Sequence, residues 1–155
     1  MAIERRIDVS SSKEKIEIIR NDYPNLTRWG FWPNAQDSFE AARAEMTSNG
    51  AIEEFERASR FLTQHCERRQ SCSKYSSYGW KHRAESWFRE QTGYREYVSN
   101  GMFIAAAIAN SFKIEYFPGS PNCRISISAK SWNVVAPAKR DAREGRLRVL
   151  ENHDA

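Results

Sequence analysis

The densest group of residues that could do chemistry lies between Tyr78 and Arg89, where a Lys-His-Arg triplet stands among aromatic residues. His82 and Ser86 are four residues apart, so on a helix they would share one face, as a base and a nucleophile can. The sequence offers no third residue to orient the histidine. A small enzyme that uses His82 therefore stays an alternative, and we assign no catalytic residue.

Cysteine and histidine are the residue types that bind zinc, and the chain holds three cysteines and three histidines. The set His65, Cys66, Cys72, His82 and Cys123 matches no zinc-finger spacing and contains no C-x-x-C pair. Three cysteines are an odd number, which favours free thiols in a reducing compartment. We expect no metal and no cofactor.

The basic excess lies in the same block as the Lys-His-Arg triplet. The whole chain carries a net charge of +4, yet residues 1–71 hold 11 basic and 12 acidic side chains, whereas residues 72–132 hold 8 basic and 4 acidic ones. This asymmetry suits a polyanionic partner, and an ordinary solvated surface is the competing interpretation. The residues expected to contact nucleic acid are Lys74, Lys81, His82, Arg83, Arg89, Lys113, Arg124 and Lys130.

Five stretches with helical periodicity must position these side chains: residues 11–22, 38–48, 51–69, 78–91 and 101–112. Ser11 or Ser12 is expected to cap the first helix and Ser76 or Ser77 the fourth, and Asn49-Gly50 is predicted to end the second. Met102 to Ala109 contains no polar side chain, so it predicts a helix buried on most of its surface. This helix should form the centre of the core.

The remaining charged residues of these helices are predicted to face solvent. Apolar residues of the fourth stretch fall on one side, and its charged residues fall on the other. Glu85 and Glu90 are expected to be solvated surface carboxylates, and Glu54 is expected opposite the buried stripe of its helix.

The pattern changes to alternation after the apolar helix. The stretches "FKIEYF" and "CRISISA", joined by "PGSPN", predict a two-stranded antiparallel hairpin. The fold class is therefore α+β, with a single small domain over residues 1–136, in which 1–71 is helical and 72–136 holds two helices and the hairpin. Residues 137–155 are expected to form a loose basic tail.

Residues 23–37 are predicted to be a loop that two prolines and a glycine interrupt. Its aromatic residues should fold back onto the core. If they are exposed instead, they would be anchors for a protein partner. These residues are Trp29, Phe31 and Trp32.

A winged-helix DNA-binding protein would show the same order of two helices and a hairpin. A recognition helix needs polar side chains that reach base edges, and Met102 to Ala109 offers none. Contacts by the remaining cationic residues would fall mostly on phosphates.

Three stretches, "SSYGWKHRAE", "YVSNGMFIAAAI" and "PNCRISIS", resemble a pattern found in small proteins of phages, plasmids and integrated elements. That pattern has glycine before the phenylalanine that ends the apolar helix, and here Ser111 precedes Phe112. The resemblance implies a setting in a bacterial mobile element, and it carries over no activity. Its polar or special positions are Tyr78, Lys81, His82, Tyr97, Asn100, Gly101 and Asn122.

These observations predict a non-enzymatic accessory protein of a mobile element that binds nucleic acid or a nucleoprotein complex. A protein-interaction module, acting as an inhibitor or adaptor of a host protein, is an alternative, as is the small enzyme. No apolar run approaches the ~20 residues that span a bilayer, and "MAIERRIDVSSSKEK" lacks the apolar region of a secretory signal. We expect a cytoplasmic protein without a membrane partner.

Overall fold

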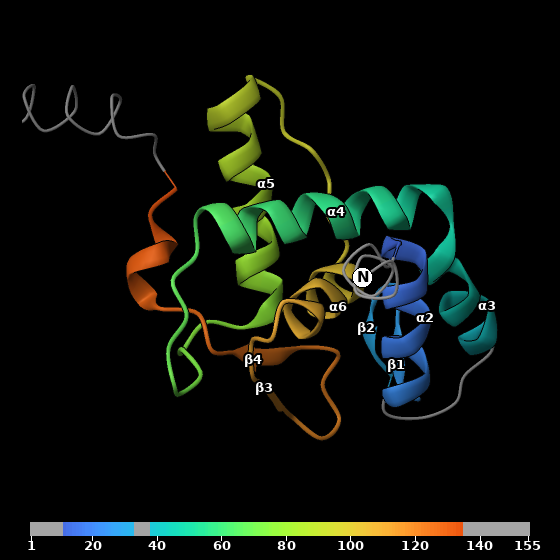
Figure 1. Ribbon diagram of the computed structural model, residues 1–155. Coiled ribbons are helices and arrows are strands. Elements are labelled where there is room, and N and C mark those ends of the chain that lie inside the picture. Colours follow the sequence, from blue (N-terminus) through green and yellow to red (C-terminus); the bar gives the residue numbers. More distant parts are fainter. Residues whose placement is uncertain (1–10, 33–37, 135–155) are drawn as a thin grey trace, which may run out of the picture.

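The computed structural model describes residues 11–32 and 38–134, so the predicted tail at 137–155 lies outside the described residues. Within these residues, five α-helices and two small antiparallel two-stranded sheets make an α+β fold, which confirms the predicted fold class (Figure 1). The helices are α2 (Ser12–Asp22), α3 (Phe39–Ala44), α4 (Asn49–Gln64), α5 (Ser77–Thr92) and α6 (Asn100–Ala109). The strands are β1 (Leu26–Thr27), β2 (Gly30–Phe31), β3 (Ile114–Tyr116) and β4 (Cys123–Ile125), and the short 3-10 helices are η1 (Glu45–Thr47) and η2 (Ala129–Trp132).

Serine side chains start three of the helices. The hydroxyls of Ser11, Ser48 and Ser76 each accept a hydrogen bond from a backbone N–H in the first turn of α2, α4 and α5. Such bonds satisfy amide groups that have no partner within the helix. The prediction for Asn49-Gly50 was wrong, because the extended Ser48 caps a new helix there and these two residues form the first turn of α4.

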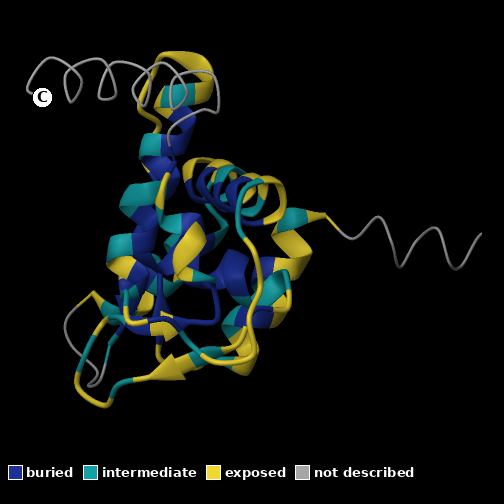
Figure 2. Cartoon of the chain, turned by 90° about the vertical axis from the view of Figure 1, so that its left-hand side faces the viewer, coloured by how far each residue is buried: buried dark blue, intermediate teal, exposed yellow. Residues whose placement is uncertain are grey.

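Helix α6 is the centre of the core, as its lack of polar side chains predicts. Residues 100 to 107 are all buried, and α6 contacts α2, α4, α5 and β2. One hydrophobic cluster joins α6 to residues from Ile16 in α2 to Val134 after η2. In Figure 2 the buried residues lie on the inward sides of the helices. Burial of this apolar surface is the main force that holds the helices together.

The predicted loop at 23–37 contains the strand pair β1–β2, whose turn packs directly against the start of α6. A Cβ atom on Gly101 would lie 1.8 Å from the Thr27 carbonyl oxygen. The Gly101 N–H instead donates to the Arg28 carbonyl at 2.9 Å. Only glycine permits two backbones to approach this closely. Gly101 thus fixes the position of the β1–β2 turn beside α6.

The second sheet is the predicted hairpin, and a further segment runs along its free side. Strands β3 and β4 pair with Glu115 opposite Arg124. The connector, which we define as residues 65–76 between α4 and α5, follows β4 in the opposite direction. Its Arg69 and Ser73 N–H groups donate to the Ser126 and Ile125 carbonyls, both at 3.0 Å. The connector and the hairpin therefore form one continuous surface layer.

Candidate binding pocket and cationic region

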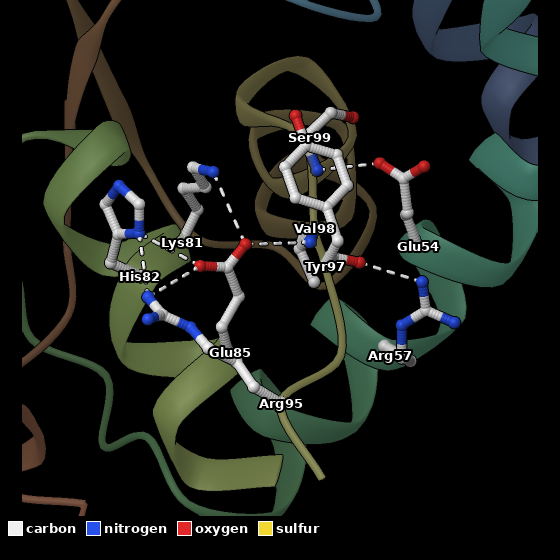
Figure 3. Close-up of polar contacts among 9 residues, drawn as sticks. All are labelled: Glu54, Arg57, Lys81, His82, Glu85, Arg95, Tyr97, Val98 and Ser99. Carbon is white, nitrogen blue, oxygen red and sulfur yellow. Dashed lines mark hydrogen bonds and ion pairs between the residues drawn. The ribbon is translucent and has the colours of Figure 1, made fainter. Parts of the chain in front are cut away.

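Two buried carboxylates hold the backbone where the chain enters α6. Glu54 on α4 and Glu85 on α5 are each 3% exposed. Glu54 accepts a hydrogen bond from the Ser99 N–H at 2.7 Å, and Glu85 accepts one from the Val98 N–H at 3.0 Å (Figure 3). Arg57 also donates to the Tyr97 carbonyl at 2.7 Å. We call residues 97–99, which these three side chains hold, the entry segment.

Each buried carboxylate is paired with at least one cationic side chain. Arg28 donates to Glu54, and Glu85 receives hydrogen bonds from Lys81 at 3.3 Å and Arg95 at 3.1 Å. Burial by itself would raise the pKa of Glu85. The Val98 N–H, the Lys81 ammonium and the His82 ring outweigh burial and hold the pKa of Glu85 below its ordinary value. Glu85 is therefore ionised at neutral pH.

This cluster corrects three sequence predictions, because Glu54, Glu85 and Lys81 are buried instead of solvated. Helical periodicity assigns them to the sides of α4 and α5 opposite the apolar stripes and gives no sign of what covers them. The entry segment covers them, and its two backbone N–H groups supply the partners that a buried carboxylate requires. Lys81 is 5% exposed and bound to Glu85, so it is not the surface phosphate contact that the sequence predicted.

His82 lies at the outer edge of the same cluster. Its Nδ1 atom is 2.9 Å from Glu85 Oε1, and its side chain is 40% exposed. A carboxylate at this distance can fix the orientation of an imidazole ring. The sequence could not identify Glu85 as the orienting residue because it was expected to be solvated.

An aromatic pocket of about 350 Å³ opens beside the entry segment. Three exposed rings, Trp29 (43%), Tyr78 (51%) and Tyr97 (50%), line it. Lys81 also lines it, with its ammonium 4.6 Å from the Tyr97 ring centre and 5.3 Å from that of Tyr78. Cation–π attraction stabilises this arrangement. The aromatic pocket thus combines large apolar surfaces with a buried positive charge.

Asn100, which is 6% exposed, forms the inner wall of the aromatic pocket. Its Nδ2 atom donates to the Pro121 carbonyl at 3.1 Å and to Asn122 Oδ1 at 3.0 Å. Its Oδ1 atom is buried and has no hydrogen-bond partner within the described residues. Gly30 lies against the same amide, because a Cβ there would be 2.7 Å from Nδ2. The β3–β4 loop, the β1–β2 turn and α6 therefore meet at this asparagine.

The three stretches that carry the resemblance converge on the aromatic pocket. Tyr78 and Lys81 come from the first stretch, Tyr97 and Asn100 from the second, and Asn122 from the third. The remaining two positions of the pattern are His82, beside Glu85, and Gly101, against the β1–β2 turn. These distant segments of the sequence form one site in the structure. Comparisons with known protein families, curated proteins and solved structures found no match.

A separate cationic region lies on the connector, the hairpin and η2. Each of its six side chains belongs to an exposed residue, and the same segments contribute only two exposed acidic residues among the described ones, Glu67 and Glu115. Arg124 lies 4.0 Å from Glu115, a loose surface pair. Backbone pairing of Arg68 with Ile127 and of Ser76 with Arg124 brings the segments together. The six residues are Arg68, Arg69, Lys74, Lys113, Arg124 and Lys130.

Half of the residues predicted to contact nucleic acid lie in this cationic region: Lys74, Lys113, Arg124 and Lys130. Lys81 and His82 belong to the Glu85 cluster instead. Arg83 lies over the Trp132 ring, 4.2 Å from its centre, and Arg89 is exposed near the end of α5. Sequence reasoning missed Arg68 and Arg69 because they precede the basic block, and only the pairing of the connector with β4 brings them to it.

The three aromatic residues predicted as partner anchors have different environments. Phe31 is 4% exposed and packs edge-on against Tyr116, with ring centres 4.9 Å apart. Trp32 is half-buried beside Phe39. The three residues are expected to be partner anchors only if they are exposed. Phe31 is buried in the core and does not meet this requirement, whereas Trp29 is exposed and lines the aromatic pocket.

The thiols and the other candidate metal ligands form no common site. Cys66, Cys72 and Cys123 are free, and burial raises the pKa of each, that of Cys123 to about 12. Among the described residues, no three His, Cys, Asp or Glu side chains group closely enough to hold a metal ion. No helix in residues 11–32 and 38–134 is both long and apolar enough to cross a membrane.

Proposed function

We propose that this protein binds nucleic acid through the cationic region. The observation that carries the proposal is the set of six exposed cations on adjoining segments of the connector, hairpin and η2, against two carboxylates. Exposed Lys and Arg side chains bind phosphates and release counterions, so the binding is strongly salt-dependent. Contacts of this kind give affinity with little sequence information.

Helix α6 contributes nothing to base reading in this proposal. Its residues from 100 to 107 are buried, and no side chain of that stretch is placed to enter a groove. The protein therefore follows the path of a phosphate backbone instead of reading a duplex sequence.

Fluorescence anisotropy with a labelled single strand and a labelled duplex, each at 50 and 200 mM salt, tests this proposal. The double charge reversal Lys113→Glu/Arg124→Glu is expected to weaken binding by about tenfold or more at low salt and to flatten the salt dependence. The matched control Lys13→Glu/Lys15→Glu changes the net charge equally, at exposed residues of α2. It should weaken binding by less than about threefold. No binding by the wild type at low salt, or equal losses in both variants, would contradict the proposal.

The setting that we propose is a bacterial mobile element, with the protein acting in the cytoplasm as a non-enzymatic accessory factor. The three stretches that resemble phage and plasmid proteins support this setting. An adaptor or inhibitor of a host protein is the competing function, supported by the exposed Trp29. A pull-down from nuclease-treated bacterial lysate separates the two, because a partner that survives nuclease and is lost in Trp29→Ala favours the adaptor.

A further inference from the structure

We infer that the aromatic pocket binds one unpaired base of a single strand, which makes the protein selective for single-stranded over duplex nucleic acid. This inference rests on the proposed function, since it assigns a second contact to the same nucleic acid. The cationic region supplies the phosphate contacts. Trp29, Tyr78 and Tyr97 supply the surfaces on which a base stacks.

Three solvent-exposed aromatic rings line the aromatic pocket. Each of the three is about half exposed, although the surrounding core buries residues as large as Trp80 and Phe103 completely. They come from three separate elements and border one concavity of about 350 Å³, within the range of small-molecule sites. Exposed rings around a concavity provide a stacking platform that every base can use, because every base has a π-face.

The aromatic pocket also contains a polar group that could bind a base. The ammonium of Lys81 has three N–H donors, and Glu85 Oε2 accepts one of them at 3.3 Å. The remaining donors suit a base carbonyl. Asn100 in the same wall shapes the aromatic pocket instead, since its Nδ2 atom donates to Pro121 and Asn122 and its Oδ1 atom is buried. Lys81 is therefore the polar group of the aromatic pocket that is placed to bind a base.

Hydrogen bonds hold two of the residues that line the aromatic pocket. Glu54, Glu85 and Arg57 hold the entry segment, which contains Tyr97. Asn100 is held by its own hydrogen bonds to Pro121 and Asn122. Binding to a site that is already ordered loses less conformational entropy.

The cationic region adjoins the aromatic pocket. Arg124 pairs with Ser76, two residues before Tyr78, and Asn122 lies two residues before Arg124 in the β3–β4 segment. One strand can therefore place a base in the aromatic pocket while its neighbouring phosphates contact the cationic region. A duplex keeps its bases paired and cannot offer one.

The test measures binding of a single strand, the corresponding duplex and a single strand carrying abasic sites. Trp29→Ala and Tyr78→Ala are expected to weaken single-strand binding about tenfold and duplex binding less than twofold, with an unchanged salt dependence. Trp29→Phe retains an aromatic face and should restore most of the affinity. Tyr94→Ala removes a tyrosine that is 75% exposed and outside the aromatic pocket, and it should have no effect.

The outcomes separate this inference from the proposed function. If the wild type binds single strand, duplex and abasic strand equally, and Trp29→Ala changes nothing, the inference is wrong and the cationic region alone accounts for binding. The inference is also overturned if Tyr94→Ala loses as much affinity as Tyr78→Ala. If no nucleic acid binds at 50 mM salt, the proposed function itself fails, and the base-binding role fails with it. Circular dichroism of each variant confirms that it is folded.

Discussion

The entry to α6 and the cationic region both gather charged side chains, but in opposite ways. At the entry, Glu54 and Glu85 are buried, and cations and backbone N–H groups surround them. In the cationic region, the charges are exposed and mostly of one sign. Buried, paired charges fix the position of a backbone segment and are costly to disturb. Exposed, unbalanced charges contribute little to stability and remain available to a partner.

The largest loss of stability is expected from a substitution at Gly101, where the start of α6 contacts the backbone of the β1–β2 turn. Gly101→Ala places a Cβ 1.8 Å from the Thr27 carbonyl oxygen, so the β1–β2 turn or α6 must move. We expect a loss of about 3 kcal/mol or more in the free energy of unfolding, measured by urea denaturation. The control Gly93→Ala has open space around it but a φ of +85°, so it should cost about 1–2 kcal/mol. Equal losses in the two variants would contradict the close approach.

The second largest loss in the free energy of unfolding is expected when a buried charge is removed. Glu85→Gln leaves the buried Lys81 without its carboxylate and is expected to cost about 3 kcal/mol, again by urea denaturation. Glu53→Gln, one residue before Glu54 but with a side chain 70% exposed, should change stability by less than about 0.5 kcal/mol. If both variants are equally stable, the carboxylate of Glu85 does not hold the entry segment.

The same variant gives a pH dependence with a definite sign. The pKa of Glu85 is lowered in the folded protein from its ordinary value of 4.5, so the unfolded chain takes up the proton more readily. The stabilisation is therefore complete above about pH 5 and is lost as the pH falls through the folded pKa. The difference in stability between wild type and Glu85→Gln should shrink on acidification from pH 7 to pH 3. A difference that stays constant would show that the charge of Glu85 is not its source.

A smaller difference should separate two serines at helix starts. Ser48→Ala removes the hydrogen bond from the Ala51 N–H to the serine hydroxyl, 3.2 Å in length, and should cost about 1 kcal/mol. Ser99 precedes α6, but its buried hydroxyl has no partner within the described residues. Ser99→Ala should therefore leave thermal stability unchanged or raise it. A loss in Ser99→Ala equal to that in Ser48→Ala would mean that the Ser99 hydroxyl caps α6, in place of the Arg28 carbonyl that accepts from the Gly101 N–H.

The smallest effect on stability is expected in the cationic region. Lys113→Ala and Arg124→Ala should each change the free energy of unfolding by less than about 0.5 kcal/mol, because both side chains are exposed. Urea denaturation at low and high salt measures this. A loss above 1 kcal/mol in either variant would show that these charges support the fold, and the contrast with the entry to α6 would disappear.

Much of the fold follows from the sequence because its signals are local. The apolar run from Met102 predicts the central helix, and the alternation on either side of "PGSPN" predicts the hairpin. Serines at helix starts act on amide groups within one turn. The wrong prediction at Asn49-Gly50 also comes from local signals. Asn and Gly often follow the end of a helix, but here they come directly after Ser48, which caps the start of α4.

The charge distribution, and hence the candidate site, could be predicted only in part. The basic excess indicates a cationic surface, and Lys74, Lys113, Arg124 and Lys130 are exposed on the connector, the hairpin and η2. Arg68 and Arg69 join them only through the pairing of the connector with β4. Lys81 is not part of that surface, because it forms a buried ion pair with Glu85. The helical periodicity of the sequence does not indicate that Glu85 is buried.

By itself, the sequence determined the helices, the hairpin and the apolar centre, because periodicity and caps depend on residues within a few positions of one another. Only the tertiary structure decided that Glu54 and Glu85 are buried, and that Trp29, Tyr78, Tyr97 and Asn122 border one pocket. These outcomes depend on the path by which distant segments return to the start of α6. That path is set by the close packing at Gly30 and Gly101 and by the partners that buried charges require.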